Sequence, residues 1–270
     1  MPELPEVENV KLSLSSQGYV GQQFSKIELL RKDLRVPFPR GLSKRMAGEL
    51  LIAIHRRAKY LLFETEHFYL LSHLGMTGSW RSFDQALKHD HVILHFTSGY
   101  RLVFNDPRRF GLLDVIAKEQ LAKSRWLKHL GVEPLSAEFN SEYIFAKTRR
   151  LKVPIKGWLM DQRRVVGVGN IYASEALFAA KVKPTRPAGK ITRAEADALV
   201  VEIRRILQEA IEAGGSTIRD YRNSHGAEGN FQKRFLVYDR AGEACPRCGA
   251  RLRSKVIAGR NTFWCAHCQV

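Results

Sequence analysis

The residues with the clearest capacity for chemistry are the first six of the chain, residues 1–6 with the sequence MPELPE. Proline at position 2 is small enough to permit removal of the initiator methionine, so we expect the mature chain to begin with the secondary amine of Pro2. The pKa of an α-amino group is about 8, roughly two units below that of a lysine ammonium. Far more of such an amine is therefore a free nucleophile near neutral pH.

A secondary amine at the start of a chain has a defined chemical use. When it attacks an aldehyde-level carbon it forms a cationic iminium, which withdraws electrons as Schiff bases do in amine catalysis. Glu3 is the next residue, so its carboxyl group is a candidate to move protons during ring opening or departure of a leaving group. The alternative is that the stretch only starts a helix, because Pro5 suits a first helical position and Glu6 suits the first turn.

All four cysteines lie in the last 26 residues, where they form two CxxC pairs. Cys245 and Cys248 make the first pair, and sixteen residues separate them from Cys265 and Cys268. This spacing predicts four thiolates arranged tetrahedrally around one Zn²⁺. Four thiolates leave no open coordination position, so we expect the zinc to be structural. His267 lies inside the second pair and is expected to be a bystander.

The chain carries a large excess of positive charge. Its 270 residues include 44 Lys and Arg against 27 Asp and Glu, a net charge of +17. This excess favours nucleic acid as a partner, then an anionic membrane surface, with a merely solubilising charge as the remaining alternative. No run approaches the roughly 18 apolar residues that a membrane-spanning helix needs, and no signal-peptide pattern is present. We therefore expect a reducing, cytoplasmic location, where disulfides are rare.

Two segments of the N-terminal half carry further candidates. Lys59 precedes an apolar strand and shares a face with Arg57 if the strand begins there, although a solvated cationic edge is the alternative. A lone buried lysine is costly, so a Lys59 facing a cleft would indicate a role. Met76 lies between two glycines, and an apolar side chain at a loop tip suits a wedge between bases, although methionine also fills gaps in cores.

The remaining candidates are basic or aromatic. His89 and His91 could share a metal, because residues two apart on a strand share a face, but phosphate contact by His89 suits the surrounding positive charge better. Arg108 and Phe110 share a turn, and their guanidinium and aromatic groups suit phosphate binding and base stacking. The alternative is a surface turn in which the aromatic ring only fills space. Arg260 lies between the two cysteine pairs, where a β-hairpin could direct its guanidinium outward.

The elements that must position these residues differ along the chain. Residues 7–17 predict a short helix from their three-to-four apolar spacing. From there to about residue 116, short apolar segments bounded by polar or glycine turns predict strands. They lie near residues 26–30, 60–63, 68–71, 91–96 and 100–104. Short strands at this spacing favour an antiparallel sandwich or barrel.

From about residue 117 the pattern turns helical. Thr192 and Glu195 predict a capping box that starts a helix, and a Gly-Gly pair ends it. Two glycines precede another helical run, residues 173–180, where backbone amides could approach an anion; a mononucleotide loop is a weaker alternative, because the lysine of a P-loop is absent. Residues 216–234 show no period and predict a functional or disordered loop. The tail from about residue 236 is expected to form strands around the zinc.

Taken together, several segments resemble the formamidopyrimidine-DNA glycosylase family, base-excision repair enzymes that act on 8-oxoguanine and have AP lyase activity. They are residues 2–8 (PELPEVE), 57–60 (RAKY), 73–76 (HLGM), 88–91 (KHDH), 106–111 (DPRRFG), 167–173 (GVGNIYA) and the four-cysteine tail. Each motif alone is modest evidence, but their joint order over nearly the whole chain is specific.

The resemblance implies an α+β fold in three modules. An N-terminal antiparallel β-sandwich with a leading helix would occupy residues 1–116 and hold the catalytic groups. A helix-two-turn-helix DNA-binding module with a base-capping loop would occupy residues 117–235. A four-cysteine zinc finger would occupy residues 236–270, and DNA would bind in the cleft between the modules.

The resemblance also implies catalytic roles. In the family, the proline that matches Pro2 attacks C1′ of the damaged nucleoside and forms the Schiff base. The glutamate that matches Glu3 acts as an acid. The lysine that matches Lys59 helps β-elimination, and the finger arginine that matches Arg260 assists δ-elimination.

Six further residues are implied to contact DNA. Three match residues that fill the gap left by the flipped nucleotide and probe the opposite base, and three match contacts to the DNA backbone. The first set is Met76, Arg108 and Phe110, and the second set is His89, Lys152 and Asn170. The loop over residues 216–234 resembles one that closes over the extruded base. Extrusion is required because the target carbon is inaccessible inside an intact stack.

The implied function is excision of 8-oxoguanine and formamidopyrimidines from damaged double-stranded DNA, followed by strand nicking through β,δ-elimination. We expect a monomer, associated with the nucleoid and not with a membrane. The nearest alternative is the endonuclease VIII-like branch for oxidised pyrimidines, which tends to have glycine where this chain has Leu4. A non-catalytic DNA-binding relative is an alternative of another class.

Overall fold

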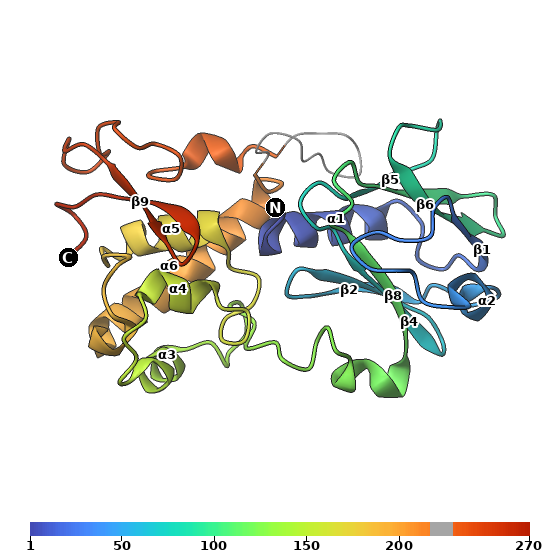
Figure 1. Ribbon diagram of the computed structural model, residues 1–270, viewed down its shortest axis with the longest axis horizontal. Helices are drawn as coiled ribbons and strands as arrows, with labels where there is room; N and C mark the ends of the chain where they lie inside the picture. Colours follow the sequence, from blue (N-terminus) through green and yellow to red (C-terminus); the bar gives the residue numbers. More distant parts are fainter. Residues whose placement is uncertain (217–228) are drawn as a thin grey trace. The chain divides into compact units, whose positions relative to one another are not determined.

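The chain divides into two units, each built from two separate stretches of sequence. The first comprises Met1–Lys128 and Ala213–Gln232, and the second comprises His129–Glu212 and Lys233–Val270. The computed structural model describes residues 1–216 and 229–270 (Figure 1). The three module boundaries expected from the sequence stay predictions.

Two four-stranded sheets form most of the first unit (Figure 1). Their strands are β1 (Phe24–Leu29), β2 (Ala53–Arg57), β3 (Tyr60–Glu64), β4 (Phe68–His73), β5 (Ser79–Ser82), β6 (Asp90–Phe96), β7 (Arg101–Asn105) and β8 (Leu112–Ala117). One sheet has the order β1-β6-β7-β5 and the other has the order β2-β3-β4-β8. Every pairing is antiparallel, so the antiparallel sheets predicted from the short apolar segments are confirmed.

Strands β3 and β4 are apolar on both faces. Leu61 and Phe63 belong to a core that contains side chains from both sheets. The intervening Leu62 points to the opposite face, as the two-residue period of a strand requires, and packs there with Leu71 in a second cluster. Because both faces are covered, these strands have continuous apolar sequences and not an alternating pattern.

The first helix, α1 (Leu4–Ser16), packs into the same core. Its buried apolar side chains recur at three-to-four spacing and are Leu4, Val7, Val10 and Leu14. The expected helix is confirmed, and it begins at Leu4 because Glu3 and Glu6 form a capping box in front of it. A terminus held by a capped and buried helix is prevented from fraying.

The remaining elements of the first unit are short. They are α2 (Leu42–Met46) and the 3₁₀ helix η1 (Lys118–Lys123), and a further 3₁₀ helix, η3 (Phe231–Arg234), begins in this unit and ends in the second. The loop expected over residues 216–234 falls largely on residues 217–228, which lie outside the described residues. At its two ends, Ser216 and Asn230 form an isolated antiparallel bridge.

Helices dominate the second unit, as the sequence predicts. They are α3 (Ser141–Thr148), α4 (Ile155–Met160), α5 (Asn170–Ala179), α6 (Arg193–Glu212) and the 3₁₀ helix η2 (Ala188–Lys190). The expected capping box starts α6, since the backbone N–H of Thr192 donates to Glu195 at 2.8 Å and that of Glu195 donates to the Thr192 hydroxyl at 3.2 Å. Among the described helices, none combines the length and apolar character needed to cross a bilayer.

A β-hairpin near the C-terminus joins β9 (Arg253–Ile257) and β10 (Arg260–Trp264). The two residues between the strands, Ala258 and Gly259, have φ of 49° and 71°. Positive φ at both positions is the signature of a type I′ turn, whose twist suits a two-residue hairpin. The hairpin expected between the cysteine pairs is therefore confirmed.

A hydrogen bond across the sandwich core provides a test of the packing. The indole Nε1 of Trp80 in β5 donates to the hydroxyl of Ser72 in β4 at 3.0 Å, and both side chains are fully buried. Ser72→Ala would leave the indole N–H without its acceptor, so we expect the free energy of unfolding to fall by about 1–3 kcal/mol. Urea unfolding of both proteins measures the difference.

Ser98→Ala, in the exposed turn between β6 and β7, serves as the matched control. It should change the free energy of unfolding by less than about 0.5 kcal/mol. Equal effects of the two substitutions would show that the bond between the sheets contributes nothing.

Candidate functional site

Charged groups converge on the start of α1. The α-amino group of Met1 interacts electrostatically with Glu3, Glu6, Lys59 and Arg108. Three of these side chains are buried, with exposed fractions of 3%, 2% and 6% for Glu3, Glu6 and Lys59. Pro2 is buried as well. Buried charges are costly unless paired or hydrogen-bonded, and such clusters mark candidate functional sites.

The environment of the terminus lowers the pKa of its amino group below the ordinary value of 8.0. Burial is the main cause, because it disfavours the ammonium form, and the charges of Lys59 and Arg108 act in the same direction. Glu3 and Glu6 oppose this effect. The net result is a larger fraction of neutral, nucleophilic amine near neutral pH.

Glu6 holds the terminus in place. Its Oε2 accepts a 2.8 Å hydrogen bond from the backbone N–H of Glu3. Its Oε1 accepts from both the backbone N–H and the hydroxyl of Ser216, each at 2.8 Å. These hydrogen bonds satisfy the buried carboxylate and join residues 210 positions apart in the chain. The sequence indicated Glu6 only as a first-turn acid, because its contact with Ser216 depends on the tertiary fold.

Lys59 lies at the tip of the hairpin formed by β2 and β3. Arg57 pairs with Tyr60, so Ala58 and Lys59 form the two-residue turn between them. Lys59 would share a strand face with Arg57 only if a strand began there, and this condition is not met, because β2 ends at Arg57 and β3 begins at Tyr60. Ala58 has a φ of 54°, a left-handed conformation uncommon outside glycine, and its carbonyl accepts a 3.0 Å bond from the Arg56 guanidinium.

The hairpin tip is also tied to α1. The Nε of Arg56 donates to Oε2 of Glu8 at 2.6 Å. Hydrogen bonds from Arg56 and Lys11 hold the pKa of Glu8 below its usual value, although burial opposes them. One arginine thus connects the turn that carries Lys59 to the helix that carries the terminus.

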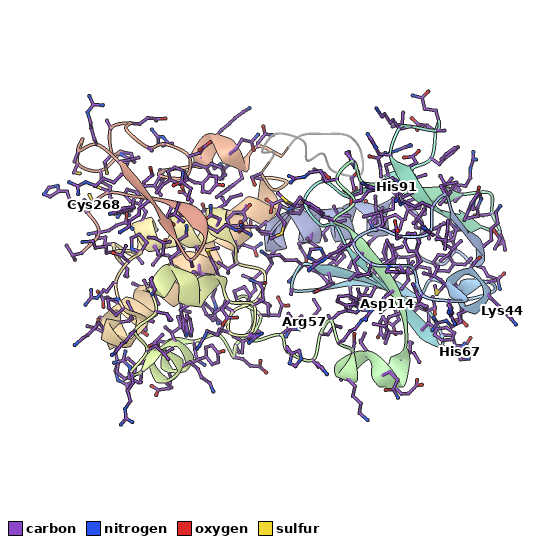
Figure 2. All side chains as sticks on the ribbon, in the orientation of Figure 1. Lys44, Arg57, His67, His91, Asp114 and Cys268 are labelled. Atoms are coloured by element: carbon purple, nitrogen blue, oxygen red, sulfur yellow. The ribbon has the colours of Figure 1, made fainter. Side chains whose placement is uncertain are left out.

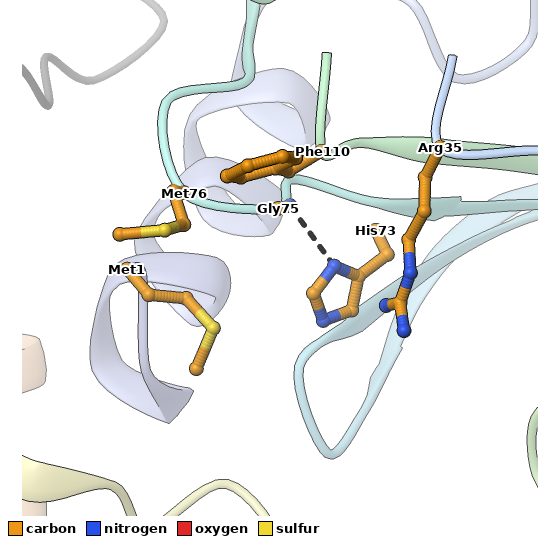
Figure 3. Close-up of a pocket in the computed structure, with 6 residues that line it drawn as sticks. All are labelled: Met1, Arg35, His73, Gly75, Met76 and Phe110. Carbon is orange, nitrogen blue, oxygen red and sulfur yellow. Dashed lines mark hydrogen bonds between the residues drawn. The ribbon is translucent and has the colours of Figure 1, made fainter. Parts of the chain in front are cut away.

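A cavity of about 310 Å³ adjoins the terminus (Figure 3). Its lining residues are Met1, Arg35, His73, Gly75, Met76 and Phe110. The Arg108 guanidinium lies 4.9 Å from the centre of the Phe110 ring. The three residues expected to fill a gap in DNA therefore come together near the start of the chain.

His73 also lines this cavity, although the sequence indicated it only as part of the motif at residues 73–76 and predicted no role for it. Its Nδ1 accepts a 2.9 Å hydrogen bond from the backbone N–H of Gly75 (Figure 3). Burial, followed by the nearby charges of Lys59 and Arg35, lowers the pKa of His73 to about 4. The ring is therefore neutral near pH 7, and its remaining proton is on Nε2.

His89 and His91 flank the buried Asp106. The backbone N–H of Asp106 donates to the carbonyl of His89 at 3.0 Å, and Nε2 of His91 (labelled in Figure 2) lies 2.9 Å from the carbonyl oxygen of Asp106. The ring centres of the two histidines are 6.5 Å apart. Within residues 1–216 and 229–270 the four cysteines form the one cluster of three or more metal-binding groups, so this histidine pair lacks a third ligand there.

In the second unit, Asn170 forms the first residue of α5 and is held by a fully buried lysine. Nζ of Lys156 donates to Oδ1 of Asn170 and, at 2.7 Å, to the hydroxyl of Thr262. The side-chain amide of Asn170 donates to the carbonyl of Asn261 at 3.0 Å. These bonds bring Asn170 beside the strand that begins with Arg260.

The other predicted site residues of this unit, the catalytic candidate Arg260 and the DNA-contact candidate Lys152, lie on its surface. Arg260 is exposed at the start of β10, next to the hairpin turn. Lys152 is exposed in the segment before α4. Both are accessible to an anionic ligand.

The four cysteine sulfurs gather at one point, with Cys268 labelled in Figure 2. All four Sγ atoms lie within 4.8 Å of one another. Cys245 and Cys268 are 3.9 Å apart, and Cys248 and Cys265 are 3.6 Å apart. A tetrahedral zinc with bonds of about 2.3 Å separates its sulfurs by about 3.8 Å, so the cluster fits one structural zinc.

Glu175 holds the segment that leads into the finger. Its buried carboxylate accepts from three consecutive backbone N–H groups, those of Leu236, Val237 and Tyr238, at 2.8–3.0 Å. Burial raises the pKa of Glu175 although these hydrogen bonds oppose the change. No sequence pattern indicates this role, because the partners of Glu175 are about sixty positions away in the chain.

The chain is similar to known DNA repair enzymes along its whole length. Family models match in order: the formamidopyrimidine-DNA glycosylase N-terminal domain at residues 1–113, its H2TH domain at residues 130–222, and a zinc finger found in FPG and IleRS at residues 242–270. A formamidopyrimidine-DNA glycosylase of Bdellovibrio bacteriovorus is 50% identical over 272 residues, covering 100% of both chains.

Solved structures are similar as well. A Lactococcus lactis FPG variant in complex with Fapy-dG-containing DNA has a TM-score of 0.91 at 36% identity and covers 99% of each chain. The Lactococcus lactis Fpg complex with abasic-site DNA has a TM-score of 0.89 at 37% identity and also covers 99% of each chain.

The lowered pKa of His73 predicts a pH-dependent stability. Between about pH 6.5 and pH 4 the unfolded chain binds a proton at this residue that the folded chain does not, so stability falls as the pH falls. His73→Asn can still accept from Gly75 but cannot be protonated. When the pH is lowered from 7.5 to 5, the free energy of unfolding should therefore fall by about 1–2 kcal/mol less in His73→Asn than in the wild type.

Urea unfolding of both proteins at the two pH values measures this difference. Contributions from all other groups are common to both proteins and cancel in the comparison. Identical pH dependence would show that His73 is protonated like an exposed histidine.

The cysteine cluster predicts the effect of losing one thiolate. Cys265→Ser should leave well under one zinc per chain and weaken DNA binding, because the finger folds around its metal. Zinc content is measured by atomic absorption, and binding by titration of a DNA duplex. His267→Ala, which changes an exposed residue between the same two cysteines, should retain one zinc. A Cys265→Ser protein that kept one tightly held zinc would contradict the four-thiolate site.

Proposed function

The chain belongs to the formamidopyrimidine-DNA glycosylase family, and from that membership we propose that it excises oxidised purines from duplex DNA and then nicks the strand as an AP lyase. The proposed substrates are 8-oxoguanine and formamidopyrimidines. A monomer acting on damaged chromosomal DNA would work in the cytoplasm, associated with the nucleoid.

One observation carries the catalytic part of the proposal. The start of the chain lies among buried charges, and these surroundings lower the pKa of the Met1 amino group, which directly precedes Pro2. This is the environment that an amine nucleophile needs, because burial disfavours its protonated form. We propose that removal of Met1 exposes the secondary amine of Pro2 as that nucleophile.

The proposed reaction begins with attack by the Pro2 nitrogen on C1′ of the damaged nucleoside. The bond between C1′ and the base breaks, and its electron pair leaves with the base, which takes up a proton. Opening of the sugar ring then gives an iminium between Pro2 and C1′. Glu3 is proposed to supply the proton that ring opening or base departure requires.

The iminium makes the following eliminations possible. Electron withdrawal toward the cationic nitrogen acidifies C2′, so loss of a C2′ proton expels the 3′ phosphate, and a second elimination expels the 5′ phosphate. Lys59 is proposed to assist the first step and Arg260 the second. A zinc held by four thiolates has no open coordination position, so its place is structural.

Six residues are proposed to bind the DNA. Met76 and Phe110, which are 38% and 44% exposed, would enter the gap left by the extruded nucleotide together with Arg108. The backbone contacts are proposed for His89, Lys152 and Asn170. With a net charge of +17, binding should weaken steeply as salt is added.

Trapping with borohydride tests the nucleophile. A duplex that contains 8-oxoguanine should give a covalent adduct in which Met1 is absent and the DNA is attached at Pro2. Pro2→Gly should excise the base more slowly, because an imine from a primary amine can lose its charge. Glu3→Gln should reduce excision by roughly 10²–10⁴-fold, the usual contribution of a general acid.

Glu28→Gln serves as the control, since Glu28 pairs with His95 and Lys26 on the sandwich away from the terminus. It should leave trapping unchanged. A processed chain that gives no adduct would refute the proposed enzyme and favour a non-catalytic relative. Clear preference for a duplex with an oxidised thymine would replace the purine substrate with a pyrimidine.

A further inference from the structure

Two loops of the first unit carry the apolar side chains proposed to enter DNA. The loop of residues 74–78 carries Met76, and the loop of residues 106–111 carries Phe110; together we call them the wedge loops. We propose that Asp106 is a positioning residue: together with Thr77, it holds the two wedge loops in a fixed geometry relative to each other. This inference rests on the proposed function, because a wedge acts only on duplex DNA.

The Asp106 carboxylate bonds to both wedge loops. Its Oδ1 accepts from the hydroxyl of Thr77 at 2.7 Å, and its Oδ2 accepts from the backbone N–H of Gly111 at 2.7 Å. The Thr77 oxygen in turn accepts from the backbone N–H of Arg108 at 3.2 Å. Asp106 is fully buried, and hydrogen bonds to a charged acceptor are stronger than neutral ones.

The backbones of the wedge loops also touch. Gly75 has a φ of 66°, and a Cβ placed on it would lie 2.4 Å from the carbonyl carbon of Phe110. Gly78 and Gly111 both lie against the buried ring of Phe104, where a Cβ on either would come within 2.7 Å. Only glycine permits this approach. Neither loop can therefore shift without displacing the other.

The base of the second loop is anchored in the sandwich. The carbonyl of Asp106 lies 2.9 Å from Nε2 of His91, a buried residue of β6. The same carbonyl accepts from the backbone N–H of Arg109 at 3.2 Å. Asp106 thus connects a rigid strand to the two exposed apolar tips.

This arrangement suits insertion into a base stack. Met76 and Phe110 are 38% and 44% exposed, and the apolar surface that each leaves in water gains nothing for the fold itself. Holding both tips in one geometry before binding avoids the ordering cost that flexible loops would incur on entering DNA. The benefit exists only where a base must be displaced from a duplex.

Asp106→Asn tests the inference, because it keeps the shape of the side chain but replaces one acceptor oxygen with a donor. Excision of 8-oxoguanine from a duplex should fall by about 10- to 100-fold, as expected for loss of a charged hydrogen bond. Nicking of a single-stranded oligonucleotide with a preformed abasic site should be unchanged, since no base is displaced. The fluorescence rise of 2-aminopurine placed opposite the lesion should slow in parallel with excision.

Two further substitutions separate positioning from folding. Thr77→Ser keeps the hydroxyl and should retain duplex excision, whereas Thr77→Val removes it and should behave like Asp106→Asn. Asp114→Asn, the control, changes a half-buried carboxylate that accepts from the Trp126 indole. It should leave the rates of duplex excision and of single-strand nicking unchanged. If Asp106→Asn does not fold, the comparison of Thr77→Ser with Thr77→Val still tests whether this hydrogen bond positions the wedge loops.

Loss of duplex excision with retained single-strand nicking supports the inference. Equal loss on both substrates, or equal rates for Thr77→Val and Thr77→Ser, overturns it while the proposed function stands. A wild-type chain that excises no oxidised base would instead refute the proposed function and, with it, the wedge.

Discussion

The need to satisfy buried carboxylates at the first turn of α1 governs this structure. Carboxylates removed from water must be hydrogen-bonded, and Glu6 meets that need by accepting from Glu3 and Ser216. The capping box and the apolar face of the helix then leave the residues before Leu4 little freedom. A chain end, ordinarily the least ordered part of a protein, becomes one of its best-positioned groups.

The same principle recurs away from the terminus. Asp106 joins the wedge loops, Glu175 holds the segment before the finger, and Lys156 orients Asn170. Each is a buried charged side chain whose hydrogen bonds link segments distant in the sequence. Of the residues proposed to meet DNA, four are exposed and two, His89 and Asn170, are half-buried, whereas Asp106, Glu175 and Lys156 are buried. The positions of the side chains proposed to bind DNA are therefore set by hydrogen-bonded polar groups in the interior.

Local patterns predicted much of the fold. The cysteine spacing predicted the finger, because ligands in a CxxC pair are close in sequence, and Thr192 with Glu195 predicted the start of α6 for the same reason. The short strands β2, β5 and β8 were not singled out. The contacts of Glu6 and His73 depend on chain segments brought together only by folding. The sequence placed Lys59 before the strand at residues 60–63, but it did not predict the tight turn there, because that turn requires a left-handed alanine at position 58, which sequence patterns disfavour.

The position of Met1 has a consequence for any preparation of this protein. Its side chain is 52% exposed and lines the cavity beside His73 and Phe110. Methionine excision would therefore do two things at once, freeing the imino nitrogen and enlarging the chamber in front of it. A molecule that kept Met1 would have neither the free nitrogen nor the space for a substrate. The concentration of active sites found by titration would therefore measure the fraction of molecules that have lost Met1, and not the total protein present.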